Sequence, residues 1–288
     1  MKLAIIGGSG KMGTWFASFL AEDGKEVLLV GRNETRLNEI NRQLGLETCT
    51  DPASVTGADV VLVSVPMDSF EDVVRLYAPH IRPEQTVIEI TSVKVKPVEA
   101  MHRYLKTERV LGVHPMFGPG ARDMANQNFI LTPTGTAEDA LAEKVKAYLE
   151  KRGGRVRVMT PEQHDETMSI VLGLPHIVAL VAADSLLALG DFESLESLGG
   201  TSCKLLLMLA DSVLSEDPQL YASLQMNLHG MRDIHLLIGE KLTEWAQLVR
   251  NGDRQGFIAR MEALKKQRAQ AGPDFRKAYE NMYRILGK

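Results

Sequence analysis

Cysteine is nearly absent from this chain of 288 residues, which contains only Cys49 and Cys203. The two lie far apart in the sequence and match no metal-ligand spacing, which argues against a disulfide framework and for a reducing, cytoplasmic compartment. Neither sign of charge dominates, because the formal net charge is -4, so neither nucleic acid nor an anionic membrane surface is expected as a partner. We expect no membrane-spanning apolar run, no metal site, and no leader before the first strand.

The first half of the chain alternates short apolar runs with helical periodicity. The runs read as strands at 3–6, 26–30, 60–65, 86–90, 109–113, 129–132 and 155–158. The periodic segments read as helices at 11–23, 34–44, 96–105 and 137–151. Alternation of this kind predicts an α/β fold, a Rossmann-type doubly wound and mostly parallel sheet.

The pattern changes at Thr160, where Thr160-Pro161-Glu162-Gln163 reads as a helix start with a capping box. From there to the C-terminus almost every segment reads as helix, which predicts a nucleotide-binding domain at 1–159 and an all-α domain at 160–288. The stretches 168–189 and 203–214 are apolar on several faces, as helices buried between other helices or between subunits are. We therefore predict a homodimer formed through the C-terminal helices.

A glycine-rich turn follows the first expected strand. Its residues fit the G-x-G-x-x-G fingerprint of dinucleotide sites: Gly8, Ser9, Gly10, Lys11, Met12 and Gly13. The first glycine of this motif allows a tight turn, the second lets the backbone approach the pyrophosphate, and the third lets the helix pack close to the strand. Because the motif follows an expected strand and opens a helix, it predicts a dinucleotide site rather than a turn without a ligand.

The end of the second expected strand bears on which dinucleotide binds. NAD enzymes usually place an acid there to bind the adenosine ribose, whereas this chain has Val30-Gly31-Arg32-Asn33. Arg32, Asn33 and the nearby Arg36 suit a 2′-phosphate, which favours NADP over NAD. The alternative is that Arg32 and Arg36 are solvated charges at a helix start.

Ligands of an open parallel sheet bind outside the carboxyl ends of its strands. Three polar or proline-containing segments follow expected strands: Ser64-Val65-Pro66, Thr91-Ser92-Val93-Lys94 and His114-Pro115. A lone histidine is more often structural than catalytic, but this one is followed by proline at a strand end and suits proton transfer near neutral pH. We therefore predict His114 as the catalytic group, with Val65 and Pro66 contacting the cofactor.

Several motifs occur in an order that resembles the prephenate dehydrogenase family of tyrosine biosynthesis. They are the glycine fingerprint, Ser92-Val93-Lys94, Leu111-Gly112-Val113-His114-Pro115-Met116-Phe117-Gly118-Pro119, Glu162-Gln163-His164-Asp165, Leu174-Pro175-His176 and Asp217-Pro218-Gln219-Leu220-Tyr221-Ala222. The resemblance covers nearly the whole chain. The His-Pro-Met-Phe-Gly-Pro segment and the order of the motifs are far more specific than the fingerprint alone.

The resemblance implies NAD(P)-dependent oxidative decarboxylation of prephenate to 4-hydroxyphenylpyruvate. It implies that His114 takes the proton of the ring C4 hydroxyl while hydride leaves C4, and that Ser92 orients His114 or this hydroxyl. Lys94 would be a cation for a substrate carboxylate or the cofactor. His176 would reach the substrate from the helical domain across a cleft, and Asp165 would be an acid behind the residues lining that cleft.

Other interpretations of three of these residues stay open. Lys94 could be a solvated charge. Asp165 could be an acid favoured by the dipole of its own helix. His176 could be a core histidine with satisfied hydrogen bonds.

One family feature is missing from the chain. The family typically has an arginine a few residues before the Asp-Pro motif, and alignment without gaps from Asp217-Pro218 places Ser212 there. No arginine occurs between Arg157 and Arg232. Because an arginine fork is the usual bidentate partner of a carboxylate, the substrate-recognition residues differ from the family pattern.

Another cation must replace this arginine if the substrate is prephenate. The candidates are Lys204, Lys94, Arg122 and Arg232. A glutamate that the family sometimes has six residues after its catalytic histidine is also missing, since that position is Gly120. A related substrate, such as arogenate or an amino analogue of prephenate, is the alternative.

Two further classes of protein compete with this interpretation. A β-hydroxyacid dehydrogenase would place a catalytic lysine on the first long helix of its second domain, but residues 168–180 contain no lysine. A non-catalytic NADP-binding sensor or scaffold is favoured by the missing arginine and opposed by the retained Ser92, Lys94, His114 and His176.

Overall fold

A computed structural model describes residues 1–190, 192–272, 275 and 277–287 of the chain. The chain divides into two compact units, Met1–Met168 and Ser169–Lys288. The helix that begins at the predicted boundary, α6 (Pro161–Met168), belongs to the first unit by its contacts. Lys288, the last residue of the predicted helical domain, lies outside the described residues.

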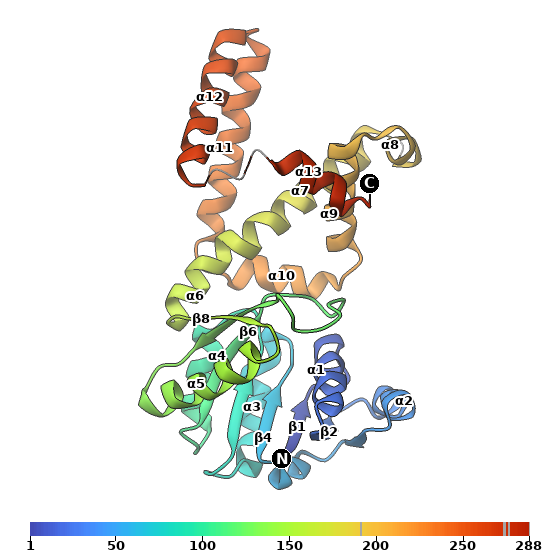
Figure 1. The fold of residues 1–288 in the computed structure, drawn as a ribbon, viewed down its shortest axis with the longest axis vertical. Coiled ribbons are helices and arrows are strands. Elements are labelled where there is room, and N and C mark those ends of the chain that lie inside the picture. Colours follow the sequence, from blue (N-terminus) through green and yellow to red (C-terminus); the bar gives the residue numbers. More distant parts are fainter. Residues whose placement is uncertain (191, 273–274, 276, 288) are drawn as a thin grey trace. The chain divides into compact units, whose positions relative to one another are not determined.

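The first unit is built on one eight-stranded sheet in the order β3-β2-β1-β4-β5-β6-β7-β8 (Figure 1). The strands are β1 (Lys2–Ile6), β2 (Glu26–Val30), β3 (Glu47–Cys49), β4 (Val60–Val63), β5 (Thr86–Glu89), β6 (Val110–Pro115), β7 (Asn128–Thr132) and β8 (Arg155–Val158). Neighbouring strands are parallel except β6 and β7, which are antiparallel. The predicted Rossmann-type fold is confirmed.

Helices cover both faces of this sheet. They are α1 (Lys11–Glu22), α2 (Glu34–Leu44), α3 (Phe70–Tyr77), α4 (Val95–Tyr104) and α5 (Thr136–Glu150), with short 3₁₀ turns at Pro52–Gly57, Met67–Ser69 and Ala78–His80. The sequence patterns predicted four of these helices to within one residue at either end. They missed β3, which has only three residues, and α3, which has only eight.

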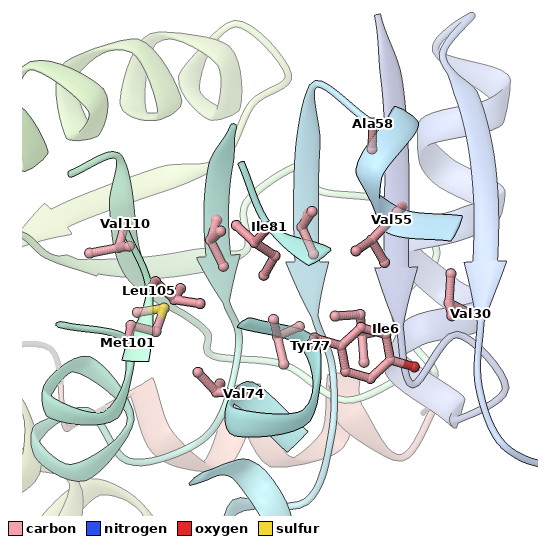
Figure 2. Close-up of a cluster of buried hydrophobic side chains, with 14 of the residues drawn as sticks. Ile6, Val30, Val55, Ala58, Val74, Tyr77, Ile81, Met101, Leu105 and Val110 are labelled. Carbon is pink, nitrogen blue, oxygen red and sulfur yellow. The ribbon is translucent and has the colours of Figure 1, made fainter. Parts of the chain in front are cut away.

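Alternation along the strands divides the core into two layers. Ala4 and Ile6 of β1 belong to one cluster, which Val74 and Tyr77 of α3 complete, as Figure 2 shows for ten labelled members. Leu3 and Ile5 point to the opposite face and join residues of α1, α2 and α5. Successive side chains of a strand face opposite sides, so a sheet covered twice needs strands that are apolar at every position.

The second unit is entirely helical over its described residues. After a π-helical turn at Ser169–Gly173 come α7 (Leu174–Leu189), α8 (Phe192–Leu198), α9 (Thr201–Leu214), α10 (Pro218–Asn227), α11 (Met231–Arg250), α12 (Arg254–Gln270) and α13 (Ala278–Ile285). Helix α7 contacts α9, and buried alanines on both helices, Ala179, Ala183 and Ala210, permit close packing. Helices α11 and α12 form a hairpin (Figure 1).

One expectation about hydropathy is corrected by the helical segment Pro161–Leu189. By length and composition it could cross a membrane, because its most apolar window has a mean hydropathy of 2.0. One such helix is weak support for a membrane protein, since core helices of soluble proteins meet the same criterion. Only 17% of that window is buried, so the apolar surface is largely uncovered within the chain.

Candidate active site

The glycine-rich turn after β1 is shaped by steric limits that only glycine meets. Gly7 has a φ of +78°, and a Cβ added there would lie 2.1 Å from the backbone oxygen of Ser64. A Cβ at Gly13 would lie 2.5 Å from the oxygen of Gly7, so α1 can pack against the turn only with glycine at this position. The residue with a left-handed backbone conformation is thus Gly7, one position before the predicted fingerprint, which begins at Gly8.

The turn has the form of a phosphate cradle. Helix α1 begins directly after it, at Lys11. The N-cap residue is Gly10, which makes no side-chain hydrogen bond to the first turn of the helix. The N–H groups of a first helical turn have no partner within the helix, and the helix dipole favours an anion there. A helix start of this kind can bind an anion such as a pyrophosphate, and it is formed by Gly8, Ser9, Gly10, Lys11, Met12 and Gly13.

The segment after β2 exposes its polar residues. Asn33 caps α2, because its Oδ1 accepts the N–H of Arg36 at 3.0 Å. Arg32 and Arg36 are exposed, and no carboxylate among the described residues pairs with either guanidinium. At the neighbouring strand end, Val65 lies against Gly7 and Pro66 precedes a 3₁₀ turn.

The loop between β5 and α4 folds around a buried carboxylate. Glu89, the last residue of β5, accepts the backbone N–H of Thr91 at 2.7 Å and is paired with the ammonium of Lys94. That ammonium also donates to the backbone oxygen of Thr91 at 2.7 Å, and both charged side chains are fully buried. Lys94 is therefore not a solvated charge, and its ammonium lies on Glu89 rather than at the surface. Ser92, at the middle of this loop, is half-buried.

Gly112 of β6 makes room for this ion pair. A Cβ at Gly112 would lie 3.0 Å from Oε1 of Glu89, 3.0 Å from Cδ of Lys94 and 2.4 Å from Oγ1 of Thr132. Residues two apart in a strand share a face, so His114 lies on the same face of β6 as this pair. The sequence pattern predicts His114 just after a strand, but His114 is the fifth residue of β6 and only 5% exposed.

His114 begins a chain of three side chains. Its Nδ1 lies 2.8 Å from Nε2 of His164, a fully buried residue of α6, and Nδ1 of His164 lies 2.7 Å from Oδ1 of Asp165. Asp165 in turn accepts the backbone N–H groups of Lys94 at 2.7 Å and Val95 at 3.0 Å. It thus caps α4, rather than acting only on the dipole of its own helix.

The local start of α6 sets up this arrangement. Thr160 and Gln163 form the predicted capping box, because each accepts the backbone N–H of the other, at 3.1 and 3.2 Å. Capping fixes where the helix begins and hence which way the next residues, His164 and Asp165, project. Asp165 is a site residue predicted from the sequence, whereas His164, its neighbour in the same motif, is not among the predicted site residues.

The electrostatic surroundings keep His114 neutral. Burial, the Lys94 ammonium and His164 together hold the pKa of His114 well below its ordinary value of 6.5. Burial also lowers the pKa of His164, against the opposing effect of Asp165. Nε2 of His114 has no protein partner among the described residues and is not one of their buried unpaired atoms, so it is open to solvent. A neutral imidazole with one free nitrogen can accept a proton.

The predicted site residues of the helical unit form no comparable cluster. His176 of α7 lies edge-on to the ring of Tyr221, with centroids 4.9 Å apart, and its buried Nδ1 has no hydrogen-bond partner within the described ranges. Burial lowers the pKa of His176. Lys204 of α9 is half-buried, and Ser212, at the position of the family arginine, donates its hydroxyl to the backbone oxygen of Leu209.

Metal ligands do not gather in the described part of the chain. No three His, Cys, Asp or Glu side chains there lie close enough together to hold an ion.

Two family models match the chain in sequence. Residues 16–158 match "Prephenate dehydrogenase, nucleotide-binding domain", and residues 160–263 match "Prephenate dehydrogenase, dimerization domain". The glycine-rich turn lies just before the first match, so it is supported by its own geometry.

Individual proteins agree with the family match. The chain is 32% identical over 270 residues to a probable arogenate/prephenate dehydrogenase of Methanocaldococcus jannaschii, covering 92% of this chain and 60% of that protein. It is 23% identical to 4-amino-4-deoxyprephenate dehydrogenase of Streptomyces pristinaespiralis, over 99% and 97% of the two chains. The crystal structure of Aquifex aeolicus prephenate dehydrogenase with hydroxyphenyl propionate and NAD+ shares the fold, with a TM-score of 0.77, 23% identity and coverage of 94% and 98%.

The Methanocaldococcus jannaschii protein and two T-proteins that the chain also matches are longer than this chain, which spans 60 to 66% of their length. Matches to both halves of the dehydrogenase, in order and over most of the chain, nevertheless agree with the fold and with the buried histidine at the end of β6. The chain belongs to the prephenate dehydrogenase family.

Proposed function

We propose that this protein is an NAD(P)-dependent dehydrogenase that oxidatively decarboxylates a cyclohexadienyl carboxylate, with prephenate as the first substrate to test. The observation that carries the proposal is the buried, neutral His114 with Nε2 open to solvent. Strands β1, β4, β5 and β6 are parallel, so His114, near the end of β6, and the glycine turn, after β1, lie at the same edge of the sheet. A base and a dinucleotide cradle at one edge are what a dehydrogenase of this kind needs.

Each proposed site residue of the first unit has its own role in this reaction. A bound dinucleotide supplies the hydride acceptor, held at its phosphates by the turn from Gly8 to Gly13. Nε2 of His114 takes the proton of the substrate hydroxyl at ring C4, where oxidation and loss of the ring carboxylate leave a phenol. Ser92 orients this hydroxyl or His114.

Lys94 has a different part from the one that the resemblance implied. Because its ammonium is buried against Glu89, we propose that it does not touch the substrate carboxylates. It folds the loop that carries Ser92, and its charge helps to keep His114 neutral. Asp165 acts behind His114 rather than on the substrate.

The carboxylates of the substrate require cations from elsewhere in the chain. Lys204 has no ionic partner among the described residues, and we propose that it takes over the charge of the missing arginine. His176, whose buried Nδ1 is unpaired in the part of the chain that the structure describes, is the second substrate contact that we propose in the helical unit.

We propose NADP as the preferred cofactor, because Arg32, Asn33 and Arg36 follow β2 where an acid would favour NAD. The exposed apolar residues of the helical unit and the match to a dimerization domain support a homodimer formed through these helices. A soluble dimer would cover the apolar surface of α7 without a membrane, in keeping with cytoplasmic location.

The test is reduction of the cofactor, followed by the absorbance of the reduced nicotinamide, with prephenate and with arogenate, each with NADP and NAD. Turnover of prephenate supports the leading proposal, and Lys204→Ala should then raise KM more than it lowers kcat. Turnover of arogenate alone would assign the missing arginine to a change of substrate. Binding of NADP without any turnover would contradict the catalytic proposal and favour a nucleotide-binding sensor.

A further inference from the structure

We propose that His164 and Asp165 hold His114 in the tautomer whose lone pair is on Nε2, and that they stabilise the positive charge that His114 gains when it takes a proton. These two are positioning residues, since they act through His114. Their catalytic meaning rests on the proposed function, but the tautomer itself is a property of the folded chain and can be measured without a substrate.

Asp165 fixes the direction of the hydrogen bonds in this chain of side chains. An ionised carboxylate can only accept hydrogen bonds. Asp165 accepts two backbone N–H groups at the start of α4, from Lys94 and Val95, and these fix the position of its oxygens. The third contact, with Nδ1 of His164 at 2.7 Å, must therefore be a donation from the ring.

The direction of this hydrogen bond determines the direction of the next one, between the two histidine rings. A neutral imidazole has one donor and one acceptor, so with Nδ1 donating, Nε2 of His164 must accept. Its partner at 2.8 Å is Nδ1 of His114, which must donate. Nε2 of His114 is left with the lone pair, on the one ring nitrogen that no protein group of the described chain contacts.

The charged groups around the rings favour this state before the reaction. The Lys94 ammonium lies on the face of β6 that carries His114, and its own partner is Glu89. A positive charge on His114 alone would be buried beside that ammonium. His164, in contrast, faces the carboxylate of Asp165. A positive charge that His114 shares with His164 is therefore stabilised by this carboxylate, whereas a charge confined to His114 would be destabilised by Lys94.

The proton is accounted for throughout. It leaves the substrate hydroxyl and binds Nε2 of His114, which becomes an imidazolium that still donates from Nδ1 to His164. No other bond in the chain changes. Hydride transfer and loss of CO2 would leave a phenolate oxygen on the product, and this oxygen takes the proton back from Nε2, so His114 is neutral again and no net proton is released. The arrangement uses the logic of a catalytic triad, in which a buried acid orients a histidine, with one more ring inserted.

The first experiment reads the tautomer directly. In the full-length protein without substrate, ¹⁵N NMR of the histidine rings distinguishes a protonated Nδ1 from a protonated Nε2, and His114→Asn assigns the signal. We expect Nδ1 of His114 to carry the proton between pH 6 and 8. A signal showing the proton on Nε2 would overturn the proposal, whatever the activity of the protein.

The sharpest variant is Asp165→Asn, which keeps the size of the side chain. Its amide can accept the N–H of Val95 and donate to His164, with loss of the acceptor for the N–H of Lys94, and this orientation reverses the direction of every hydrogen bond that follows. We expect His114 to change tautomer and kcat to fall by about a hundredfold or more, with cofactor binding unchanged. The matched control Glu162→Gln makes the same change on an exposed residue of α6 and should alter neither.

A second pair of variants keeps the idea open to refutation if Asp165→Asn does not fold. His164→Gln retains an acceptor for Nδ1 of His114 and should keep the tautomer and most of the rate, whereas His164→Leu should lose both. Equal behaviour of Gln and Leu would refute a role for the hydrogen bond. The expected tautomer in a wild-type protein that turns over no cyclohexadienyl substrate would leave this inference standing and reject the proposed function instead.

Discussion

The two units of this protein differ in which side chains they bury and which they expose. The first buries charged and polar groups, among them Glu89, Lys94, His114 and His164. The second exposes apolar ones: of the large hydrophobic residues that are exposed in the described chain, four belong to the first unit and 24 to the second. Buried polar groups are costly unless paired, and exposed apolar surface is costly unless covered. This difference is what we expect if the second unit, rather than the first, carries the surface of the proposed dimer.

The largest effect should come from breaking the buried ion pair in the first unit. Lys94→Met leaves the carboxylate of Glu89 buried without its cation, which should destabilise this unit by about 3–5 kcal/mol. Urea unfolding followed by the fluorescence of Trp15, in a Trp245→Phe background, reports on this unit because the chain has only these two tryptophans.

The double variant Lys94→Met/Glu89→Gln is the control for this measurement. It removes both charges and keeps an acceptor for Thr91, so it should recover most of the lost stability. If Lys94→Met alone unfolds at the same urea concentration as the wild type, the pair is not buried as the structure has it.

Replacing the proposed base should have the next largest effect, on rate rather than stability. His114→Asn should lower kcat by about a hundredfold or more, because a general base is lost while the glycine turn is untouched. NADP binding, measured by calorimetry, should stay unchanged. His229→Asn, at an exposed histidine of the helical unit, is the matched control. Unchanged turnover in His114→Asn would remove this residue from the mechanism.

Charging the exposed apolar surface tests the other side of the comparison. Val178 and Val181 are exposed residues of α7, 41% and 48% accessible. If a second copy covers them, Val178→Glu/Val181→Glu should weaken the dimer by about a hundredfold, since two carboxylates would be desolvated in each subunit. Analytical ultracentrifugation across a range of concentrations measures this. Lys144→Glu, which changes the net charge by the same amount in the first unit, should leave the dimer intact, and a monomeric wild type would contradict the proposed assembly.

The smallest effect expected is on the choice of cofactor. Arg32→Asp should shift the ratio of kcat/KM for NADP to that for NAD by about tenfold to a hundredfold toward NAD, the range of one charge-assisted hydrogen bond. Arg42→Asp, at the other end of α2, makes the same change of charge away from the strand end. A ratio that does not move in Arg32→Asp would mean that this loop does not contact the 2′-phosphate.

Elements with strong local signals could be predicted from the sequence. Strands buried on both faces are continuous apolar runs, and α1, α2, α4 and α5 have regular apolar spacing and recognisable starts. The capping box of Thr160 and Gln163 is equally local, because both partners lie within one turn. Strand β3, with three residues, is too short to show a period.

The candidate site could be predicted only in part. Ser92 and the glycine turn could be predicted from their positions after strands, and His114 from its position near the end of one, because parallel strands bring their carboxyl ends to one edge. The direction of the Lys94 side chain could not be predicted, since it depends on Glu89 five residues earlier and on the space left by Gly112 in another strand. The role of His164 was missed because its contact with His114 joins residues 50 positions apart.

The sequence by itself determined the class of fold, the glycine-rich turn, the helical second half and the histidine near the end of β6. Those features depend on periodicity, on steric limits at glycine and on neighbouring residues in the chain. Only the tertiary structure decided which charges are buried, which hydrogen bonds run from Asp165 to His114, and which apolar faces the chain leaves uncovered. These depend on distances between segments remote in sequence, and burial and hydrogen-bond direction have no meaning until those segments meet.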